Sequence, residues 1–468
     1  MENLKEIEFY EILKESSSIK FRIINFSEID LSNIASIEFI DCVFSKPITI
    51  FDNEESNEKK TIKLSKCIIN HLHITKCNID ILSVFEIKIA NKFSISNCKI
   101  DKFNFFDCLD LNCLIELKYN IFFEVFNFEN NHFETGSLIL YDNSFLKECI
   151  FQKNNFYILG FAKTVFKDFL ALTNNTFSKE RNADFFICEF QKADFSGLEN
   201  VLFRFSYCNF YNNCLFNDIK YYITNEIKIE DCLFEKNLQF NKTSIYRLQI
   251  KDLKCEEIAS FQDTFFDEIQ IERAIFSQGA LFDDIQIKNI DNCDRRTIRT
   301  IKLQLQKFDN KIDYNRFRVY EFNAYRKETN HKLKKYKKDI NRFSHRKREP
   351  IQLERDLFVL NISEFVSEYG TDWKRALKFT LITGFLFFTS FYILENFNLS
   401  IDSNNWEDFV FGYFRFFLIT DFKNEYYETG ESVLKFNCFL SLFPFIIGKI
   451  AVAFGLYEMI QSFRKFKS

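Results

Sequence analysis

Residues 123–138 read FEVFNFENNHFETGSL and place Phe or Leu at every fifth position. The same spacing of large apolar residues recurs in the ranges 29–44, 64–79, 151–166 and 185–195. A period of five fits neither the 3.6-residue turn of a helix nor the two-residue alternation of a strand. It fits a chain that turns a corner every five residues and points one large side chain inward from each side. Stacked coils of this kind would bury a continuous ladder of Phe and Ile, and no single coil would be stable alone.

A second, smaller residue repeats in register with this pattern, two positions before the large one. It is Cys or Asn, at positions that include Cys42, Cys67, Cys98, Asn131, Asn175, Cys188, Cys208 and Cys232. Most of the 14 cysteines fall in this slot, and none forms a Cys-x-x-Cys pair. We therefore expect the thiols to act as small buried apolar groups in a reducing compartment. Glycine is scarce, so Asn and Asp are expected to supply the turns.

These repeats resemble the pentapeptide-repeat family over roughly residues 25–290. The resemblance implies a right-handed, four-sided β-helix with about twenty residues per coil. Phe takes the place of the family's central Leu, and Cys or Asn takes the small-residue position. We therefore assign residues 1–290 to an N-terminal β-helix domain, with an irregular all-β sandwich as the alternative. The whole chain is predicted to be mainly β, followed by an α-helical membrane domain.

The β-helix domain shows no catalytic motif, and we expect neither enzyme activity nor a cofactor. It has no phosphate-binding glycine loop and no Gly-x-Ser-x-Gly sequence. His71 and His73 would share one face of a strand, as a metal-binding pair does, but no carboxylate or cysteine motif completes a site. Two surface histidines and no metal are therefore expected. The domain is acidic, with net charge −12, whereas residues 291–468 carry +8. A scaffold or sensor is the favoured interpretation.

From residue 291 onward, the apolar residues recur with the spacing of an α-helix. Apolar residues step by three and four at Ile298, Ile301, Leu305, Phe308 and Ile312. This spacing predicts an amphipathic helix with a narrow apolar seam. The seam could cap the last coil of the β-helix or pair between subunits as a short coiled coil, and the cap is the more ordinary use. We assign residues 291–372 to a helical linker whose last helix ends at Gly370 as the C′ residue, with Thr371 or Asp372 capping the next helix.

Eleven Lys and Arg, with only two acids, lie between Arg326 and Arg348. Three uses are open: a solvated surface, attraction to anionic headgroups at about 1 kcal/mol per charge, and binding of an oligonucleotide or another polyanion. The candidate residues for lipid or polyanion binding are Lys332, Lys334, Lys335, Lys337, Lys338, Arg342, Arg346, Lys347 and Arg348.

Residues 373–468 are predicted to form a membrane domain. Its two apolar stretches, about residues 376–395 and 434–458, approach the ~20 residues that a helix needs to cross a bilayer. Basic residues precede the first stretch and follow the second, whereas residues 395–431 carry eight acids against two bases. The positive-inside rule then places both ends in the cytoplasm and the acidic loop outside. Because no signal peptide is visible, we expect a multi-pass protein of the bacterial inner (plasma) membrane with a cytoplasmic β-helix.

A shorter aromatic segment, residues 406–422, lies between the two stretches and is too short to cross and return. This layout resembles the two-transmembrane pore of the potassium-channel-like superfamily, which implies a re-entrant pore segment and four subunits. Residues 419–422 lack the glycines of a potassium filter, so potassium selectivity is not expected. The candidate pore-lining residues are Thr420, Asp421, Asn437, Ser441 and Lys449, and the candidate gating hinge is Pro444 with Gly448. Snorkelling toward the headgroups is the alternative for Lys449.

We therefore expect a cytoplasmically gated, poorly selective ion channel or pore-forming membrane effector. Its β-helix would sense a ligand or protein partner, and analogy alone suggests bacterial antiviral defence. One alternative is a non-conducting, membrane-anchored scaffold that binds a protein through the β-helix surface. Another is binding of nucleic acid or an oligonucleotide through the basic linker. The expected partners are the lipid bilayer and further copies of the chain, with a tetramer favoured.

Overall fold

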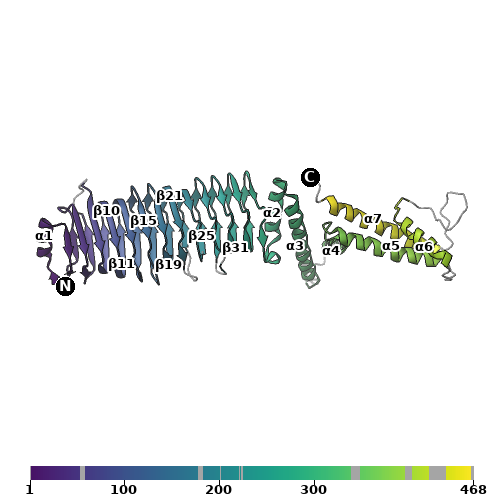
Figure 1. Ribbon diagram of the computed structural model, residues 1–468, viewed down its shortest axis with the longest axis horizontal. Helices are drawn as coiled ribbons and strands as arrows, with labels where there is room; N and C mark the ends of the chain where they lie inside the picture. The colour runs from purple at the N-terminus through teal and green to yellow at the C-terminus, as the bar shows by residue number, and fades with distance from the viewer. Residues whose placement is uncertain are drawn as a thin grey trace. The chain divides into compact units, whose positions relative to one another are not determined.

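In a computed structural model, the chain forms two compact units, Met1–Phe308 and Asp309–Ser468 (Figure 1). The first unit is a parallel β-solenoid of about 13 turns, and the second is helical. The structure describes residues 2–52, 58–177, 183–200, 202–220, 222, 225–338, 348–395, 403–420 and 439–464. The predicted β-solenoid followed by helices is therefore confirmed, and the alternative of a β-sandwich is wrong, because the described strands pair in parallel between successive coils.

One ladder of strands runs along the solenoid. It comprises β1 (Glu2–Leu4), β3 (Arg22–Ile24), β6 (Val43–Phe44), β9 (Ile68–Thr75), β11 (Lys88–Ser96), β13 (Leu114–Lys118), β16 (Ser137–Tyr141), β20 (Ile158–Ala162), β23 (Ala183–Phe186), β25 (Leu202–Ser206), β28 (Glu226–Glu230), β31 (Ser244–Lys251), β34 (Phe265–Glu272) and β37 (Gln286–Ile287). Two further strands, β4 (Glu28–Asp30) and β7 (Ile48–Phe51), pair beside it.

The remaining strands form the other sides of the coils. They are β2 (Ser18–Lys20), β5 (Ser36–Ile40), β8 (Lys60–Ser65), β10 (Asn78–Phe85), β12 (Lys99–Phe106), β14 (Ile121–Phe122), β15 (Phe126–Glu129), β17 (Ser144–Phe145), β18 (Cys149–Gln152), β19 (Asn155–Phe156), β21 (Val165–Thr173), β22 (Thr176–Phe177), β24 (Glu189–Asp194), β26 (Asn209–Phe210), β27 (Cys214–Leu215), β29 (Leu233–Phe234), β30 (Leu238–Gln239), β32 (Lys254–Cys255), β33 (Ile258–Ser260), β35 (Ile275–Phe276) and β36 (Gly279–Leu281).

The core of the solenoid is a set of stacked side chains, as the five-residue period predicts. Within one side, such as β16, residues alternate between half-exposed and buried, because each strand keeps its two-residue pleat. The rings of Phe145 and Phe166 are parallel within 4°, with centroids 5.0 Å apart. Those of Phe210 and Phe234 are parallel within 3°, with centroids 4.4 Å apart. These distances follow the ~4.8 Å separation of neighbouring strands, so strand pairing and ring stacking support each other.

The small inward slot holds buried cysteines and asparagines. All thirteen cysteines that the structure describes are free and buried, as predicted. The asparagines form ladders between coils: the Asn131 side-chain amide donates to Asn154 Oδ1 at 3.1 Å, and the Asn154 amide donates to Asn175 Oδ1 at 3.0 Å. Asn154 Nδ2 also donates to the Phe128 carbonyl at 2.8 Å. Buried amides are therefore satisfied on both sides of the coil.

The residue before this slot turns the corner with a positive φ. Asn and Asp do this at many corners, for example Asp41 and Asn130, as expected. The same conformation is taken by Lys66, Tyr119 and Ile187, so the expectation that Asn and Asp supply the turns was only partly correct. This conformation costs a non-glycine residue about 1–2 kcal/mol, and the packing and hydrogen bonding of the coil compensate for that cost.

Helices close both ends of the solenoid. At the start, α1 (Glu6–Glu15) buries Phe9, whose ring stacks on Phe39 with centroids 6.2 Å apart. At the end, the 3₁₀-helix η1 (Ile290–Asn292) leads into α2 (Arg295–Lys307). Thr297 Oγ accepts the Ile271 N–H at 2.8 Å, and Gln304 Oε1 accepts the Ala280 N–H at 3.0 Å. The predicted capping of the last coil is therefore confirmed.

The predicted apolar seam is shorter than expected. Ile298, Ile301 and Leu305 are buried in α2, but the helix ends at Lys307. Asp309 has φ +58°, which breaks the helix, and Ile312 is 73 % exposed on the next helix. The extension of one seam to Ile312 was therefore wrong.

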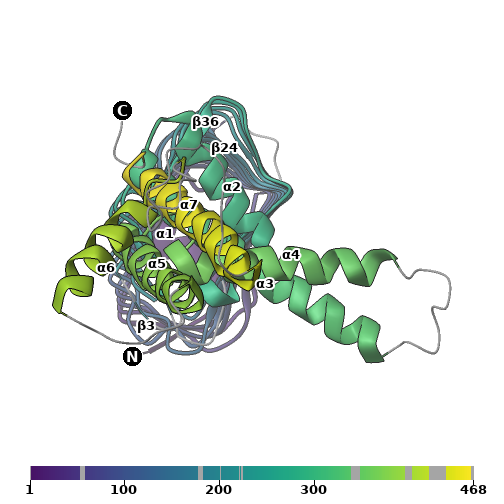
Figure 2. The ribbon, with the colours of Figure 1, turned by 90° about the vertical axis from the view of Figure 1, so that its right-hand side faces the viewer.

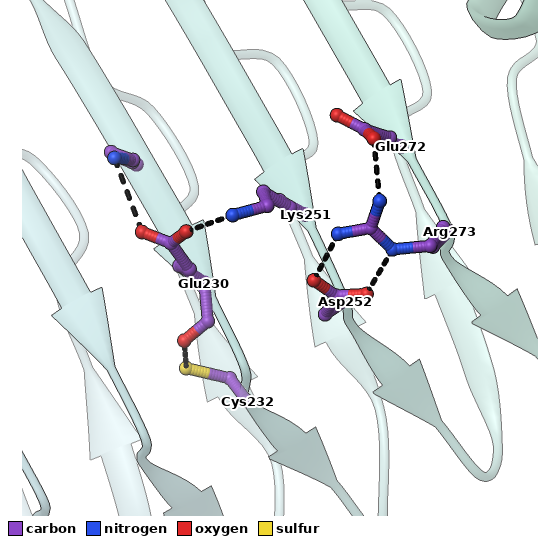
Figure 3. Close-up of polar contacts among 7 residues, drawn as sticks. Glu230, Cys232, Lys251, Asp252, Glu272 and Arg273 are labelled. Carbon is purple, nitrogen blue, oxygen red and sulfur yellow. Dashed lines mark hydrogen bonds and ion pairs between the residues drawn. The ribbon is translucent and has the colours of Figure 1, made fainter.

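Opposite charges on neighbouring coils line the outer surface near the end of the solenoid (Figure 3). Lys251 Nζ lies 2.5 Å from Glu230, and Arg273 contacts both Asp252 and Glu272. The hydrogen bond from Arg273 lowers the pKa of Asp252. Each exposed pair contributes little, but the alternating signs favour one register of the coils.

The second unit consists of helices. They are α3 (Lys311–Lys338), α4 (Arg348–Ser367), α5 (Trp373–Glu395), α6 (Ser403–Phe416), the 3₁₀-helix η2 (Phe439–Ser441) and α7 (Leu442–Arg464). Two helical stretches, α5 and Phe439–Arg464, are long and apolar enough to cross a membrane. Figures 1 and 2 show α5 and α7 packed side by side, with α6 next to them.

Candidate functional site in the membrane hairpin

The candidate site is the hairpin of α5 and α7, and small residues bring these helices together. A Cβ atom on Gly448 would lie 2.6 Å from the Cβ of Phe387, and one on Gly455 would collide with Thr380. Thr380 is buried and donates its hydroxyl to the Ala376 carbonyl of its own helix at 2.7 Å. Small residues that allow close backbone approach are typical of helix pairs in membranes.

The short helix α6 packs on both α5 and α7. Phe416 is buried, and its ring centroid lies 5.7 Å from Phe388 of α5 and 5.9 Å from Phe445 of α7. The Tyr413 hydroxyl donates to the Leu381 carbonyl of α5 at 3.0 Å. At 14 residues, α6 is about 21 Å long, whereas the hydrocarbon layer is about 30 Å thick. The predicted aromatic segment is thus a helix too short to span a bilayer.

Lys449 joins α7 to the carboxyl end of α6. It is 4 % exposed, and its Nζ donates to the Leu418 carbonyl, two residues past the end of α6, at 2.7 Å. The ammonium group also lies over the Phe416 and Phe445 rings, 5.0 and 5.5 Å from their centroids. A cation at a helix carboxyl end complements its partial negative charge, and both rings add cation–π attraction.

The other predicted pore residues occupy different environments. Ser441 is buried and donates its hydroxyl to the Glu395 carboxylate at the end of α5, whereas Thr420 is exposed just beyond α6. Asp421 and Asn437 lie outside the described residues. Pro444 is in the first turn of α7, where proline is tolerated, and Gly448 lies at the contact with Phe387 and Phe416. Of the predicted pore residues, the structure brings Lys449 close to the segment that carries Thr420.

A polar corner connects the linker helices to the hairpin. The chain turns between α4 and α5 through Glu368, Tyr369 and Gly370, with φ of 51°, 59° and 75°. Helix α4 ends at Ser367, and Gly370, the predicted C′ residue, has the expected positive φ but follows two further residues with positive φ. As predicted, Asp372 caps α5, since its Oδ1 accepts the Lys374 N–H at 2.9 Å.

Three helices stabilise this corner. Arg318 of α3 donates to the Tyr369 carbonyl at 2.9 Å. The Ser367 hydroxyl accepts the Gly370 N–H at 2.7 Å and donates to the Glu458 carboxylate of α7 at 2.5 Å. Ser367 and Glu458 are both buried. The strained turn is thus held from α3 on one side and from α7 on the other.

Comparison with family models, curated proteins and solved structures finds no match to this chain. The function proposed below therefore rests on the geometry of the site.

The remaining predicted residues are on the solenoid and on α3. His73 Nδ1 lies 2.8 Å from the Ser94 hydroxyl, and no group of three or more His, Cys, Asp or Glu in the described chain could hold a metal ion. Lys332, Lys334 and Lys335 are exposed on α3. Only the backbone is described for Lys337, Lys338 and Arg348, and residues 342, 346 and 347 lie outside the described ranges.

Sequence reasoning missed four polar residues of the hairpin and its corner, Arg318, Ser367, Glu395 and Glu458. A signal was present for Glu458: Gly448, Val452, Gly455, Glu458 and Ser462 repeat at intervals of three and four on one buried face of α7. Small and polar residues with this period in an apolar helix predict a packed face. No comparable signal marks Arg318, because its contact depends on the corner.

Proposed function

We propose that this protein is a pore-forming membrane effector or poorly selective ion channel, with α5, α6 and α7 as its membrane domain. The observation that carries the proposal is the return of the short helix α6 onto both spanning helices, with its carboxyl end held by Lys449. This arrangement fits a re-entrant segment. Non-helical backbone at membrane depth is tolerated only where protein or a water-filled cavity surrounds it, and here Lys449 binds the carbonyl of Leu418 just past the end of α6.

A plain membrane anchor explains this arrangement less well. An anchor needs only one apolar helix, and a buried lysine within an apolar span is costly to insert. The hairpin instead buries Lys449 beside the rings of Phe416 and Phe445, and it buries Ser441 and Glu395 as a hydrogen-bonded pair. Ionisable groups in this setting are characteristic of transport pathways and of the elements that gate them.

The polar corner is the route by which we propose the membrane domain is controlled. A displacement of α3 would move the Tyr369 carbonyl, because Arg318 is hydrogen-bonded to it. The hydrogen bond between Ser367 and Glu458 would then transmit this movement to α7. We assign the solenoid the role of sensor for a ligand or protein partner. We place the protein in a bacterial inner membrane with both termini in the cytoplasm, and antiviral defence is the biological role that this organisation suggests.

We also propose that the solenoid is a divergent, right-handed, four-sided pentapeptide-repeat fold. Four short strands, β16 to β19, follow one another within residues 137–156, which supports four sides. Coil-to-coil hydrogen bonds join residues 21 to 23 positions apart, close to the period that the family resemblance implies.

The test is ion flux from liposomes that contain the full-length protein, together with membrane potential on expression in bacteria. We expect the wild type to dissipate an ion gradient. Lys449→Met should change the flux several-fold, because it releases the end of α6, whereas Lys449→Arg should retain the contact in part. The exposed Lys378→Met is the matched control and should behave as the wild type. A wild-type protein that neither conducts nor lowers the membrane potential would contradict the proposal.

A membrane-anchored scaffold is the second candidate, because one edge of the solenoid exposes aromatic side chains. Tyr119 is 50 %, Phe186 is 44 % and Tyr207 is 56 % exposed, and the last two rings lie 5.8 Å apart. Exposed aromatic clusters are common in protein-binding surfaces. This candidate predicts capture of a protein through the solenoid without any ion flux. Oligonucleotide binding by the basic part of α3 would instead show a steep loss of affinity with salt.

A further inference from the structure

Helix α4 is apolar on two opposite faces. Leu357 and Leu360 on one face are buried, and Leu360 belongs to a cluster with Val319 of α3 and Tyr369. On the other face, Ile351, Phe358 and Phe365 recur every seventh residue and are 50 %, 67 % and 75 % exposed. A seven-residue repeat keeps side chains on one side of a helix, so these three residues form a continuous stripe. We refer to them as the α4 stripe.

Two of the acids of α4 face α3 and not the stripe. Glu364 forms an ion pair with Arg326 of α3, and Asp356 accepts the Tyr325 hydroxyl at 3.0 Å. These two acids are therefore engaged on the α3 side. Two exposed charged residues, Glu354 and Arg355, lie beside the stripe on the helical wheel. A row of large exposed apolar residues that is flanked by charged side chains indicates an interaction surface.

The direction of α4 shows what can cover this surface. In Figure 1 α5 and α7 are seen lengthwise and α4 is foreshortened, whereas in Figure 2 α4 is seen lengthwise beside α3. Helix α4 therefore does not continue α5 but leaves it at a steep angle. If α5 crosses the bilayer, α4 runs along its surface. The ring of Phe365 lies 6.3 Å from that of Phe379, so the stripe is continuous with the apolar surface of α5.

We propose that the α4 stripe lies in the boundary between headgroups and acyl chains of a bilayer with anionic lipids, and that α3 covers α4 on the aqueous side. This inference rests on the membrane insertion of α5 and α7 in the proposed function. Amphipathic helices bind such surfaces through an apolar face and flanking cations. The exposed cations nearby in the chain are Arg355, Lys374 and Arg375, with Lys332 and Lys334 on α3. They provide attraction to anionic headgroups.

The test measures contact with lipid at single positions of the full-length protein. A bimane label is placed at Phe358→Cys or Phe365→Cys in a Cys438→Ser background, since the thirteen described native cysteines are buried. Gln352→Cys, exposed and about a quarter turn from Ile351, is the matched control. Leu386→Cys, 58 % exposed on α5, reports insertion of the span. Each variant is reconstituted into vesicles of phosphatidylcholine and phosphatidylglycerol with nitroxide-labelled lipid.

Quenching several-fold stronger at positions 358 and 365 than at 352, with a blue-shifted bimane emission, is the expected result. Strong quenching at 386 with none at 358 would overturn the inference and leave the membrane domain intact. Absence of quenching at 386 would contradict the proposed function itself. Efficient disulfide formation between two copies through Phe358→Cys, without lipid quenching, would instead identify the stripe as a contact between subunits and would also overturn the inference.

Discussion

Cysteine and asparagine share one inward slot in the solenoid but bond differently there. A cysteine such as Cys42 offers one weak hydrogen bond, from its thiol to the Ile19 carbonyl at 3.3 Å. Asn154 instead joins its own coil to the coils on both sides, through Asn131, Asn175 and the Phe128 carbonyl. A buried amide is stabilising only when every partner is in place, so the asparagine ladders specify the register of the coils more strongly than the cysteines do.

Asn154→Ala tests this role. The substitution removes the acceptor for two hydrogen bonds from Asn131, at 2.9 and 3.1 Å, and leaves buried donors unpaired. We expect a loss of at least about 2 kcal/mol in the free energy of unfolding. Urea denaturation followed by circular dichroism measures it. Asn112→Ala is the control, because Asn112 bonds to Glu134 and Thr135 at the exposed surface, and it should cost less than about 0.5 kcal/mol. Equal losses in the two variants would contradict the ladder argument.

His73 predicts a pH dependence of stability. Burial lowers the pKa of this imidazole below its ordinary value of 6.5. The unfolded chain therefore takes up the proton first as the pH falls, and the folded state loses stability below about pH 6.5. We expect the melting temperature of the wild type to drop between pH 7.5 and pH 5.5 by more than that of His73→Gln.

His71→Gln is the control for this comparison, because His71 lies on the same face of β9. It should keep most of the wild-type difference between the two pH values. If His73→Gln and the wild type lost the same stability on acidification, the burial of His73 would not be the cause.

The sequence predicted what fills the core but not what turns the corners. The large apolar residues and the small Cys or Asn residues recur in the sequence at a regular spacing. They do so because each coil must fill the same volume at the same position of the core. Corner residues such as Ile187 and Tyr207 have no such signature. Their positive φ is imposed by the stack and contradicts their own conformational preference.

Among the elements, the short helix α6 depends most on its neighbours. Its aromatic side chains contact α5 and α7, and Lys449 binds the carbonyl just past its end. The sequence predicted a segment too short to span, because its length and aromatic content can be read directly. The contact between Lys449 and Leu418 could not be predicted, since the two residues lie 31 positions apart and no periodicity relates them.

Gly455→Ala tests the packing of α5 against α7. The added methyl group would collide with Thr380, which is buried on α5. Overpacking of a tight contact costs about 1–3 kcal/mol, so we expect a lower melting temperature in detergent. The double variant Gly455→Ala/Thr380→Ala should recover part of the loss, because it removes the colliding hydroxyl and methyl groups. Thr380→Ala alone is the control, and a double variant as unstable as the sum of both single variants would contradict a direct contact.

At the scale of the whole molecule, an acidic unit built from coils is joined to a basic, helical unit. The change of apolar period near residue 291 and the apolar stretches after residue 373 indicate such a division in the sequence, although the first unit also includes α2 and extends to Phe308. The candidate site is harder to predict from the sequence, because the polar groups that connect the corner to the hairpin come from three separate helices, α3, α4 and α7. Such tertiary contacts follow from the fold and not from any local pattern.

The number of subunits decides between the two candidate functions. One hairpin cannot enclose a water-filled path: in the described part of the chain, Ser441, Lys449 and Glu458 are all buried within a single copy. The apolar residues Ile446, Ile450 and Tyr457 of α7 are 42 %, 64 % and 60 % exposed, so this helix has surface left for lipid or for a neighbouring copy. A closed ring of copies would supply the missing wall. We expect light scattering in detergent to give the mass of four chains, and Ile450→Trp to shift that mass toward smaller species, with Lys378→Met as the control. A strictly monomeric wild type would contradict the pore and would favour the membrane-anchored scaffold.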